Sequence, residues 1–134
     1  MILVLCLDDA LGMMFNHRRQ SRDRVLVADL LDTVGNGRLF VSPYSKALFP
    51  PEATCVAVAD DPCAAAGKED FVFVEDTDPT AAWEKVTAIL IYRWNRLYPA
   101  DKRFCGDMTG FTLTETREFA GSSHDTITKE VWKK

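Results

Sequence analysis

Short runs of consecutive apolar residues recur along the chain and are separated by polar segments. The first, Ile2 to Leu7, ends directly before the polar pair Asp8 and Asp9. A run of this length and character is typical of a strand buried on both faces, such as one in the middle of a sheet that helices cover. Further strand-like runs follow at 38–42, 54–59, 71–74 and 88–94. We therefore predict a sheet that contains these strands, with the first strand at its centre.

Helical spacing is found in the connections between these runs. Val27, Leu30, Leu31 and Val34 recur at the period of an α-helix, and the segment 35–37, Gly-Asn-Gly, ends the pattern. Ser21 is the predicted N-cap, so we expect a helix over about 22–34. Three later connections begin with a capping residue before a proline, which predicts a short helix or turn at each. These pairs are Ser42-Pro43, Asp61-Pro62 and Asp78-Pro79.

The last third of the chain has a different pattern. Residues 111–115 alternate between apolar and polar side chains, 120–123 supply turn residues, and 126–132 are strand-like again. This order predicts an antiparallel hairpin at the C-terminus. Strands that alternate with helices and are followed by a hairpin indicate one α/β domain over residues 1–134, with three layers and a mostly parallel central sheet.

Composition and charge narrow the class of protein. Of the 134 residues, 47% are hydrophobic and 27% are charged, which is an ordinary balance for a globular domain. No stretch has the apolar length of a membrane span, and the start of the chain lacks the pattern of a secretory signal, so we expect neither. The four cysteines form no CxxC pair, which indicates a reducing, cytoplasmic setting. The net charge of -4 argues against a general affinity for duplex nucleic acid.

The order of these segments resembles the dihydrofolate reductase family. The opening ILVLCLDDALGMMFN is similar to that family's first strand and its glycine-containing active-site loop. Residues 88–104, AILIYRWNRLYPADKRF, resemble its late strand and the loop that follows. The resemblance extends to 38–45, to 54–59 and to the hairpin at 111–132. It implies a dihydrofolate reductase-like fold for most of the chain.

The departures from this family concern its chemistry. The family's Leu-Pro-Trp segment is replaced by Arg19-Gln20-Ser21, and Asp23 is the nearest carboxylate to the acid that protonates the pterin. The paired glycines that approach the cofactor pyrophosphate are replaced by Glu75-Asp76, whose charges would repel it. A helix-strand unit is also missing between 59 and 71. We therefore expect no cofactor and no NADPH-dependent reductase activity.

A basic segment suggests a different site. Residues 16–24 contain four arginines and a histidine in a chain of negative net charge. If the resemblance holds, the loops 8–21, 93–101 and 120–125 meet at one end of the sheet. The acid-base candidates are then His17 and His124. The candidate ligand-binding residues are Arg18, Arg19, Arg22, Arg93, Asn95, Arg96, Ser122 and Ser123.

The residue types in these loops favour an anion. Arginine binds phosphate or carboxylate oxygens in a bidentate manner, hydroxyls and a helix N-terminus near Ser21 add donors, and histidine moves protons near neutral pH. We expect Arg19, Arg96 and His124 to share a pocket, with Asp8 or Asp9 offsetting the charge of the arginines. A purely structural interpretation stays open, in which arginines form surface ion pairs and 121–123 is an ordinary turn.

Other chemistries have little support in the sequence. The histidines and carboxylates match no zinc motif, so we expect no metal. The segment 35–37 precedes a strand and is not a phosphate loop, and no Gly-x-Ser-x-Gly nucleophile motif is present.

Two functions therefore remain. The first is a small cytoplasmic protein that binds an anionic, phosphorylated ligand, with or without acid-base catalysis. The alternative is a non-enzymatic interaction module, such as an immunity protein whose acidic segments 60–61 and 69–78 neutralise a basic toxin or nuclease.

Overall fold

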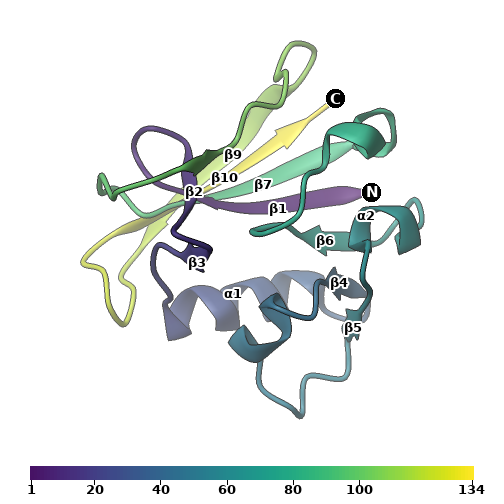
Figure 1. Cartoon of the computed structure of the whole chain (residues 1–134), viewed down its shortest axis with the longest axis horizontal. Coiled ribbons are helices and arrows are strands. Elements are labelled where there is room, and N and C mark those ends of the chain that lie inside the picture. The colour runs from purple at the N-terminus through teal and green to yellow at the C-terminus, as the bar shows by residue number, and fades with distance from the viewer.

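The computed structural model describes all residues, 1–134, and contains two β-sheets (Figure 1). The strands of the large sheet are β1 (Ile2–Leu7), β4 (Leu39–Val41), β5 (Val56–Val58), β6 (Phe71–Phe73), β7 (Ala88–Arg93), β9 (Thr112–Phe119) and β10 (Ile127–Lys133). Their order is β5-β4-β6-β1-β7-β10-β9, so β1 is the central strand, as predicted. The β5-β4, β4-β6, β6-β1 and β1-β7 pairings are parallel, whereas β7-β10 and β10-β9 are antiparallel. The α/β class, the mostly parallel sheet and the C-terminal hairpin are therefore confirmed.

The helical elements are short. They are α1 (Arg24–Val34), α2 (Pro62–Ala65) and the 3-10 helices η1 (Ser45–Leu48) and η2 (Thr80–Lys85). Each lies in a connection where the sequence predicts a helix or a turn. None has the length and apolar character that crossing a membrane requires.

α1 begins two residues later than the sequence predicts, and its N-cap is Asp23 rather than Ser21. Asp23 has an extended backbone, and its side chain accepts hydrogen bonds from the amides of Val25 and Leu26. Both residue types cap helices well, so local sequence offered two candidates and tertiary contacts decided between them. The predicted end of the helix is confirmed, because Gly35 follows the last turn with a φ of 55°.

The two faces of the large sheet bury different residues of β1. α1 covers one face, where Leu30 and Val34 pack in one cluster with Val4, so the predicted packing of this helix on the central strand is confirmed (Figure 1). Leu5 points to the opposite face and has no exposed surface. Cys6 is only partly buried, contrary to expectation, because its side chain lines a narrow cavity on the α1 face.

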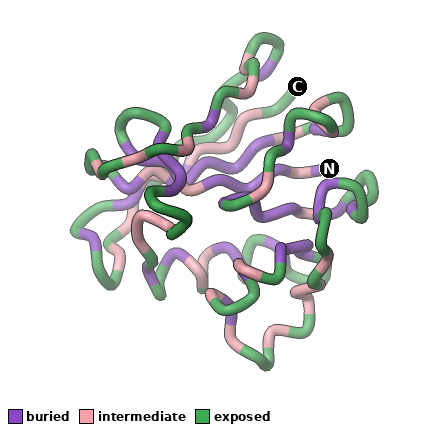
Figure 2. The backbone as a smooth tube through the Cα atoms, viewed as in Figure 1, coloured by how far each residue is buried: buried purple, intermediate pink, exposed green.

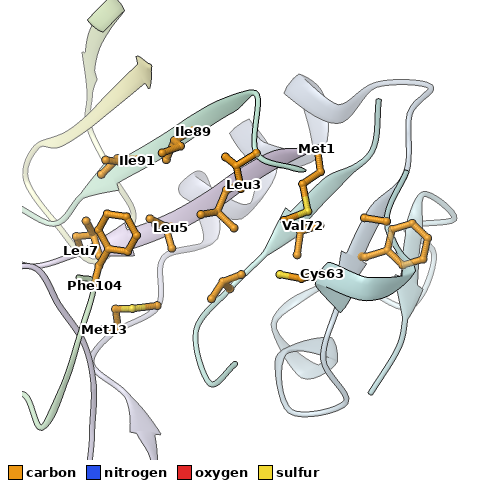
Figure 3. Packing of buried hydrophobic residues seen from close by; sticks show 14 of the residues in the cluster. Met1, Leu3, Leu5, Leu7, Met13, Cys63, Val72, Ile89, Ile91 and Phe104 are labelled. Carbon is orange, nitrogen blue, oxygen red and sulfur yellow. The ribbon is translucent and has the colours of Figure 1, made fainter. Parts of the chain in front are cut away.

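The opposite face of the sheet is covered by short segments. Figure 3 shows Leu3, Leu5 and Leu7 of β1 beside Ile89 and Ile91 of β7. This layer is closed by residues from β2, α2, η2 and the segment 104–111, namely Met13, Cys63, Trp83, Phe104 and Phe111. The third layer therefore consists largely of turns and loops. Figure 2 shows buried residues along the central strands, while β9 at the edge is exposed along most of its length.

The small sheet was not predicted. It consists of β2 (Gly12–Phe15), β3 (Arg18–Arg19) and β8 (Lys102–Arg103), in the order β3-β2-β8. The sequence predicts a loop at 12–19, but Asn16 and His17 adopt φ values of 52° and 61°, which permit a two-residue hairpin turn. The turn lacks the glycine that usually marks such hairpins, so the local sequence gives only a weak signal for it.

Candidate functional site

The three loops expected to meet do so at the carboxyl end of β1 (Figure 1). Ser21 of the first loop and Tyr98 of the second both contact His124 of the third, with hydroxyl oxygens 3.3 and 2.8 Å from Nε2. The amide of Asp9 donates to the carbonyl oxygen of Arg96 at 2.9 Å and joins the first two loops. The loops therefore form one connected surface with a histidine beneath it.

Asp23 ties the third loop to the N-terminus of α1. Besides the two helix amides, its carboxylate accepts hydrogen bonds from the amides of Ser122 and Ser123 at 3.0 and 2.8 Å. Burial alone would raise the pKa of the Asp23 carboxyl, but the amides of Ser122, Ser123 and Leu26 outweigh it and hold that pKa well below its ordinary value. The helix N-terminus is thus occupied by a resident carboxylate. The donors expected there for a bound anion are already in use.

His124 is held on three sides. It is 5% exposed, its Nδ1 lies 3.3 Å from Oδ2 of Asp23, and its ring stacks on Trp94 at 4.5 Å between centroids. Ser123 Oγ lies 3.0 Å from the same Nδ1. In the tautomer with the proton on Nδ1, that nitrogen donates to Asp23 or to Ser123, and Nε2 accepts from the hydroxyl of Ser21 or of Tyr98. The ring therefore has a defined orientation.

The arginines do not gather around His124. Arg19 donates to both carboxylate oxygens of Glu75, at 3.0 and 2.8 Å, and its guanidinium stacks on Tyr44. Arg93 is paired with Glu130 at 2.9 Å. The cavity that Arg19 lines includes neither Arg96 nor His124, so the structure does not bring these three residues into one pocket.

Asp8, which we expected to offset the charge of the arginines, has a different role. Asp8 is buried, and it accepts hydrogen bonds from the amides of Ala10 and Gly12 and from Gln20 Nε2, at 2.6 to 2.9 Å. It contacts no arginine. Its role is to hold the turn between β1 and β2.

The other candidates have separate positions. His17 and Arg18 are exposed at the β2-β3 turn and on β3. Asn95 donates to the carbonyl oxygen of Thr126 and so links two of the loops. The Ser122 hydroxyl accepts from the amide of Arg24 at 2.9 Å. Arg22 lines both the cavity and the groove described below and has no ion-pair partner.

A narrow cavity lies between α1 and the sheet, beneath residues 20–22. Its volume of about 20 Å³ is enough for about one water molecule. The wall is mostly apolar, and its residues include Cys6, Leu26, Leu30, Phe49, Phe73 and Trp94. Gln20, Ser21 and Glu75 supply polar groups, and the buried Oε1 of Gln20 has no hydrogen-bond partner.

A wider groove adjoins this cavity. It has a volume of about 640 Å³ and lies between α1 and residues 47–51, with Arg22, Asp23, Val27, Leu48 and Phe49 common to both spaces. Leu31, Pro50 and Pro51 extend its apolar wall, and Arg24 stands with Arg22 at one end. Neither arginine forms an ion pair. The groove therefore combines an apolar wall with two free positive charges.

Several of these residues could not be found from the sequence. Trp94 and Tyr98 lie in a loop where the sequence drew attention to arginines and an asparagine. Glu75 was interpreted as part of an acidic segment, although it is buried against Arg19. The partners are far apart along the chain, and no local pattern predicts such pairs. Asp23 did carry a signal, since an aspartate directly before a helical pattern is a strong N-cap.

No group of three or more His, Cys, Asp or Glu side chains is placed to hold a metal ion. No protein-family model matches the chain, and no curated protein matches it either.

Proposed function

We propose that the protein binds a small anionic ligand in the groove between α1 and residues 47–51, with the acid group at Arg22 and Arg24. The observation that carries this proposal is the groove itself, in which two unpaired arginines stand at the end of an apolar wall. Its volume suits a small molecule, since ligand pockets commonly measure about 300–1,000 Å³.

The chemistry of the ligand follows from the groove. Arginine forks pair with phosphate or carboxylate, and a phosphate monoester offers enough oxygens for both guanidinium groups. Val27, Leu31 and Phe49 would pack against an apolar or aromatic body. The ligand we propose is therefore a phosphorylated molecule with an apolar portion. Four cysteines, none in a disulfide, suit the reducing cytoplasm in which we place it.

The architecture supports a dihydrofolate reductase-like ancestry without reductase activity. A central first strand, parallel neighbours and a terminal hairpin follow the order that the resemblance implies. At the position of the pyrophosphate-binding glycines, however, Glu75 binds Arg19, and Asp76 accepts from the hydroxyl of Ser42 at 2.7 Å. Two carboxylates and a buried ion pair at this point disfavour a dinucleotide.

The interaction-module alternative has weaker support. Two carboxylates of the acidic segment 69–78 are used inside the protein, because Asp70 pairs with Arg38 and Glu75 with Arg19. The surface left for a basic partner is therefore less acidic than the sequence suggests. We rank ligand binding first for this reason.

Isothermal titration calorimetry tests the proposal with phenyl phosphate, nucleoside monophosphates and inorganic phosphate as probes. We expect phenyl phosphate to bind more tightly than inorganic phosphate, because only the former uses the apolar wall. The double variant R22A/R24A should weaken binding by at least about tenfold, the effect of roughly 1.4 kcal/mol. Arg18→Ala, a change of an exposed arginine on the same basic segment, is the matched control and should bind normally. The absence of binding at millimolar concentrations, or equal losses in both variants, would contradict the proposal.

A further inference from the structure

Where the loops 8–21, 93–101 and 120–125 meet the N-terminus of α1, which we call the loop cluster, three side chains have the order of contacts found in serine hydrolases. The Oγ of Ser21 lies 3.3 Å from Nε2 of His124, and Nδ1 of His124 lies 3.3 Å from Oδ2 of Asp23. A nucleophile, a base and an orienting acid are recognised by such geometry and not by their order in the sequence. Contacts of this length are ordinary before a substrate binds, since catalytic hydrogen bonds often tighten only in the complex.

The surroundings of Asp23 and His124 suit these roles. The carboxylate is completely buried and held by backbone amides, so it stays ionised and fixes the proton of His124 on Nδ1. Trp94 stacks on the imidazole at 4.5 Å and fixes the plane of the ring. The lone pair of Nε2 is consequently directed at the hydroxyl groups of Ser21 and Tyr98. An orienting acid of a triad acts on its histidine in the same way.

Two hydroxyls compete for this one lone pair. Tyr98 Oη is 2.8 Å from Nε2 and Ser21 Oγ is 3.3 Å away, but Nε2 of the neutral ring accepts only one proton in its plane. When Ser21 donates to His124, the Tyr98 hydroxyl is free to donate elsewhere. Because both hydroxyls contact the same Nε2, the freed Tyr98 hydroxyl is our candidate donor to the negative oxygen that forms on the substrate carbonyl, a role that tyrosine hydroxyls perform in oxyanion sites.

The position of Ser21 gives access to a substrate. It is partly exposed and lines the apolar cavity, which has Arg22 in common with the wider groove. The cavity has room for about one water molecule and is lined by Gln20, whose Oε1 is buried without a hydrogen-bond partner and would accept from that water. The bulk of an acyl group would therefore lie in the groove, with its carbonyl carbon at Ser21 and a water molecule beside it.

We infer that Ser21 is the nucleophile of a Ser21-His124-Asp23 triad that hydrolyses carboxylic esters with an apolar acyl group. Ser21 Oγ attacks the ester carbonyl carbon and its proton passes to Nε2. The bond to the leaving alcohol breaks, and that alcohol takes the proton from Nε2. Water then attacks the serine ester and gives a proton to Nε2. The serine ester bond breaks, Ser21 recovers the proton and the carboxylic acid leaves.

Labelling with a fluorophosphonate tests this inference directly. The reagent phosphonylates an activated serine, and peptide mass spectrometry identifies the modified residue. We expect the label on Ser21 of the wild-type protein, together with hydrolysis of p-nitrophenyl butyrate above the rate in buffer. Ser21→Ala should abolish both signals, and His124→Gln should lower the hydrolysis rate by at least about a hundredfold. Thr116→Ala is the matched control, because it removes an exposed hydroxyl from the edge strand β9 and leaves the three loops unchanged.

Circular dichroism of each variant separates loss of chemistry from loss of folding. His124→Gln removes a buried ring, whereas Ser21→Ala removes a single hydroxyl at the surface of a cavity and should fold normally. A folded wild-type protein that takes no label at Ser21 overturns the inference, as does equal labelling in wild type and His124→Gln. The two proposals place different molecules in the same groove, but their tests are separate, since the labelling and the ester assay contain no phosphorylated ligand and the titration contains no ester.

Discussion

Asp23→Ala should be the most destabilising change of a single polar side chain near the loop cluster. The carboxylate caps α1 through the amides of Val25 and Leu26, and it also holds the amides of Ser122 and Ser123. Loss of a cap costs about 1 kcal/mol, and each amide left without its partner costs about 1 kcal/mol where water can partly replace it. We expect a loss of about 3 kcal/mol, a large share of the roughly 5–15 kcal/mol that stabilises a typical domain.

A second N-cap aspartate provides the control. Asp61 caps α2 through one hydrogen bond to the amide of Ala64 at 3.2 Å, and it is exposed. Asp61→Ala should therefore cost only about 0.5–1 kcal/mol. Urea unfolding at pH 7, followed by circular dichroism, measures both losses against the wild type. Wild-type and variant proteins should show the same dependence of unfolding free energy on urea concentration, so that differences between their unfolding midpoints report stability alone.

The pH dependence of the loss gives a second measurement. The pKa of Asp23 is lowered in the folded state, so its contribution to stability is complete above the unfolded-state pKa of about 3.9 and is lost as the pH falls through the folded-state pKa. The difference between the wild type and Asp23→Ala should be constant from pH 7 to 5 and shrink below about pH 4. Two results would refute the role of Asp23 in joining the third loop to α1. One is a loss of unfolding free energy no greater than that of Asp61→Ala, and the other is a difference between wild type and Asp23→Ala that is unchanged at pH 3.

Two further changes test the core and the basic segment. Leu5→Asp places a charge at a fully buried position on the central strand and should prevent folding, because an unpaired buried charge costs several kcal/mol; a cooperatively folding variant in circular dichroism would contradict this. Arg19→Ala leaves Glu75 without its partner and should cost about 2–3 kcal/mol in urea unfolding. Arg18→Ala, at an exposed neighbouring position, should cost less than about 0.5 kcal/mol, and equal losses at both positions would show that the ion pair contributes little.

The parts of the fold that the sequence predicts are those whose pattern is local. The apolar run of β1 and the helical spacing of α1 each record burial within one segment, so the strand was predicted with its observed bounds and the helix with an error of two residues at its start. The small sheet depends instead on β8, whose two residues, Lys102 and Arg103, pair with a strand far away in the chain. Two polar residues contain no strand signal. Only the folded chain can supply the partner that makes them a strand.

The basic segment shows a similar limit for the site. Arg18 and Arg19 are adjacent on β3, and side chains of adjacent strand residues point to opposite faces. Arg19 therefore turns inward to Glu75, while Arg18 stays exposed. Arg22 precedes α1 and reaches the groove. The arginines of the basic segment are neighbours in the sequence, but the folded protein places them in three different environments. The reason is that successive side chains of a strand, and of the turn that precedes a helix, point in different directions.

Gly121 lies in a turn, as the sequence predicts, but the structure gives a different reason for a glycine at this position. The sequence assigns it to a turn, where glycine is common because it adopts positive φ. Its φ is not in the left-handed region, however, and a Cβ at this position would lie 2.3 Å from Oδ2 of Asp23. The glycine allows the hairpin tip to approach the buried carboxylate, and that approach brings His124 within reach of Ser21. The contact joins segments about a hundred residues apart in the chain, so the site exists only through tertiary structure.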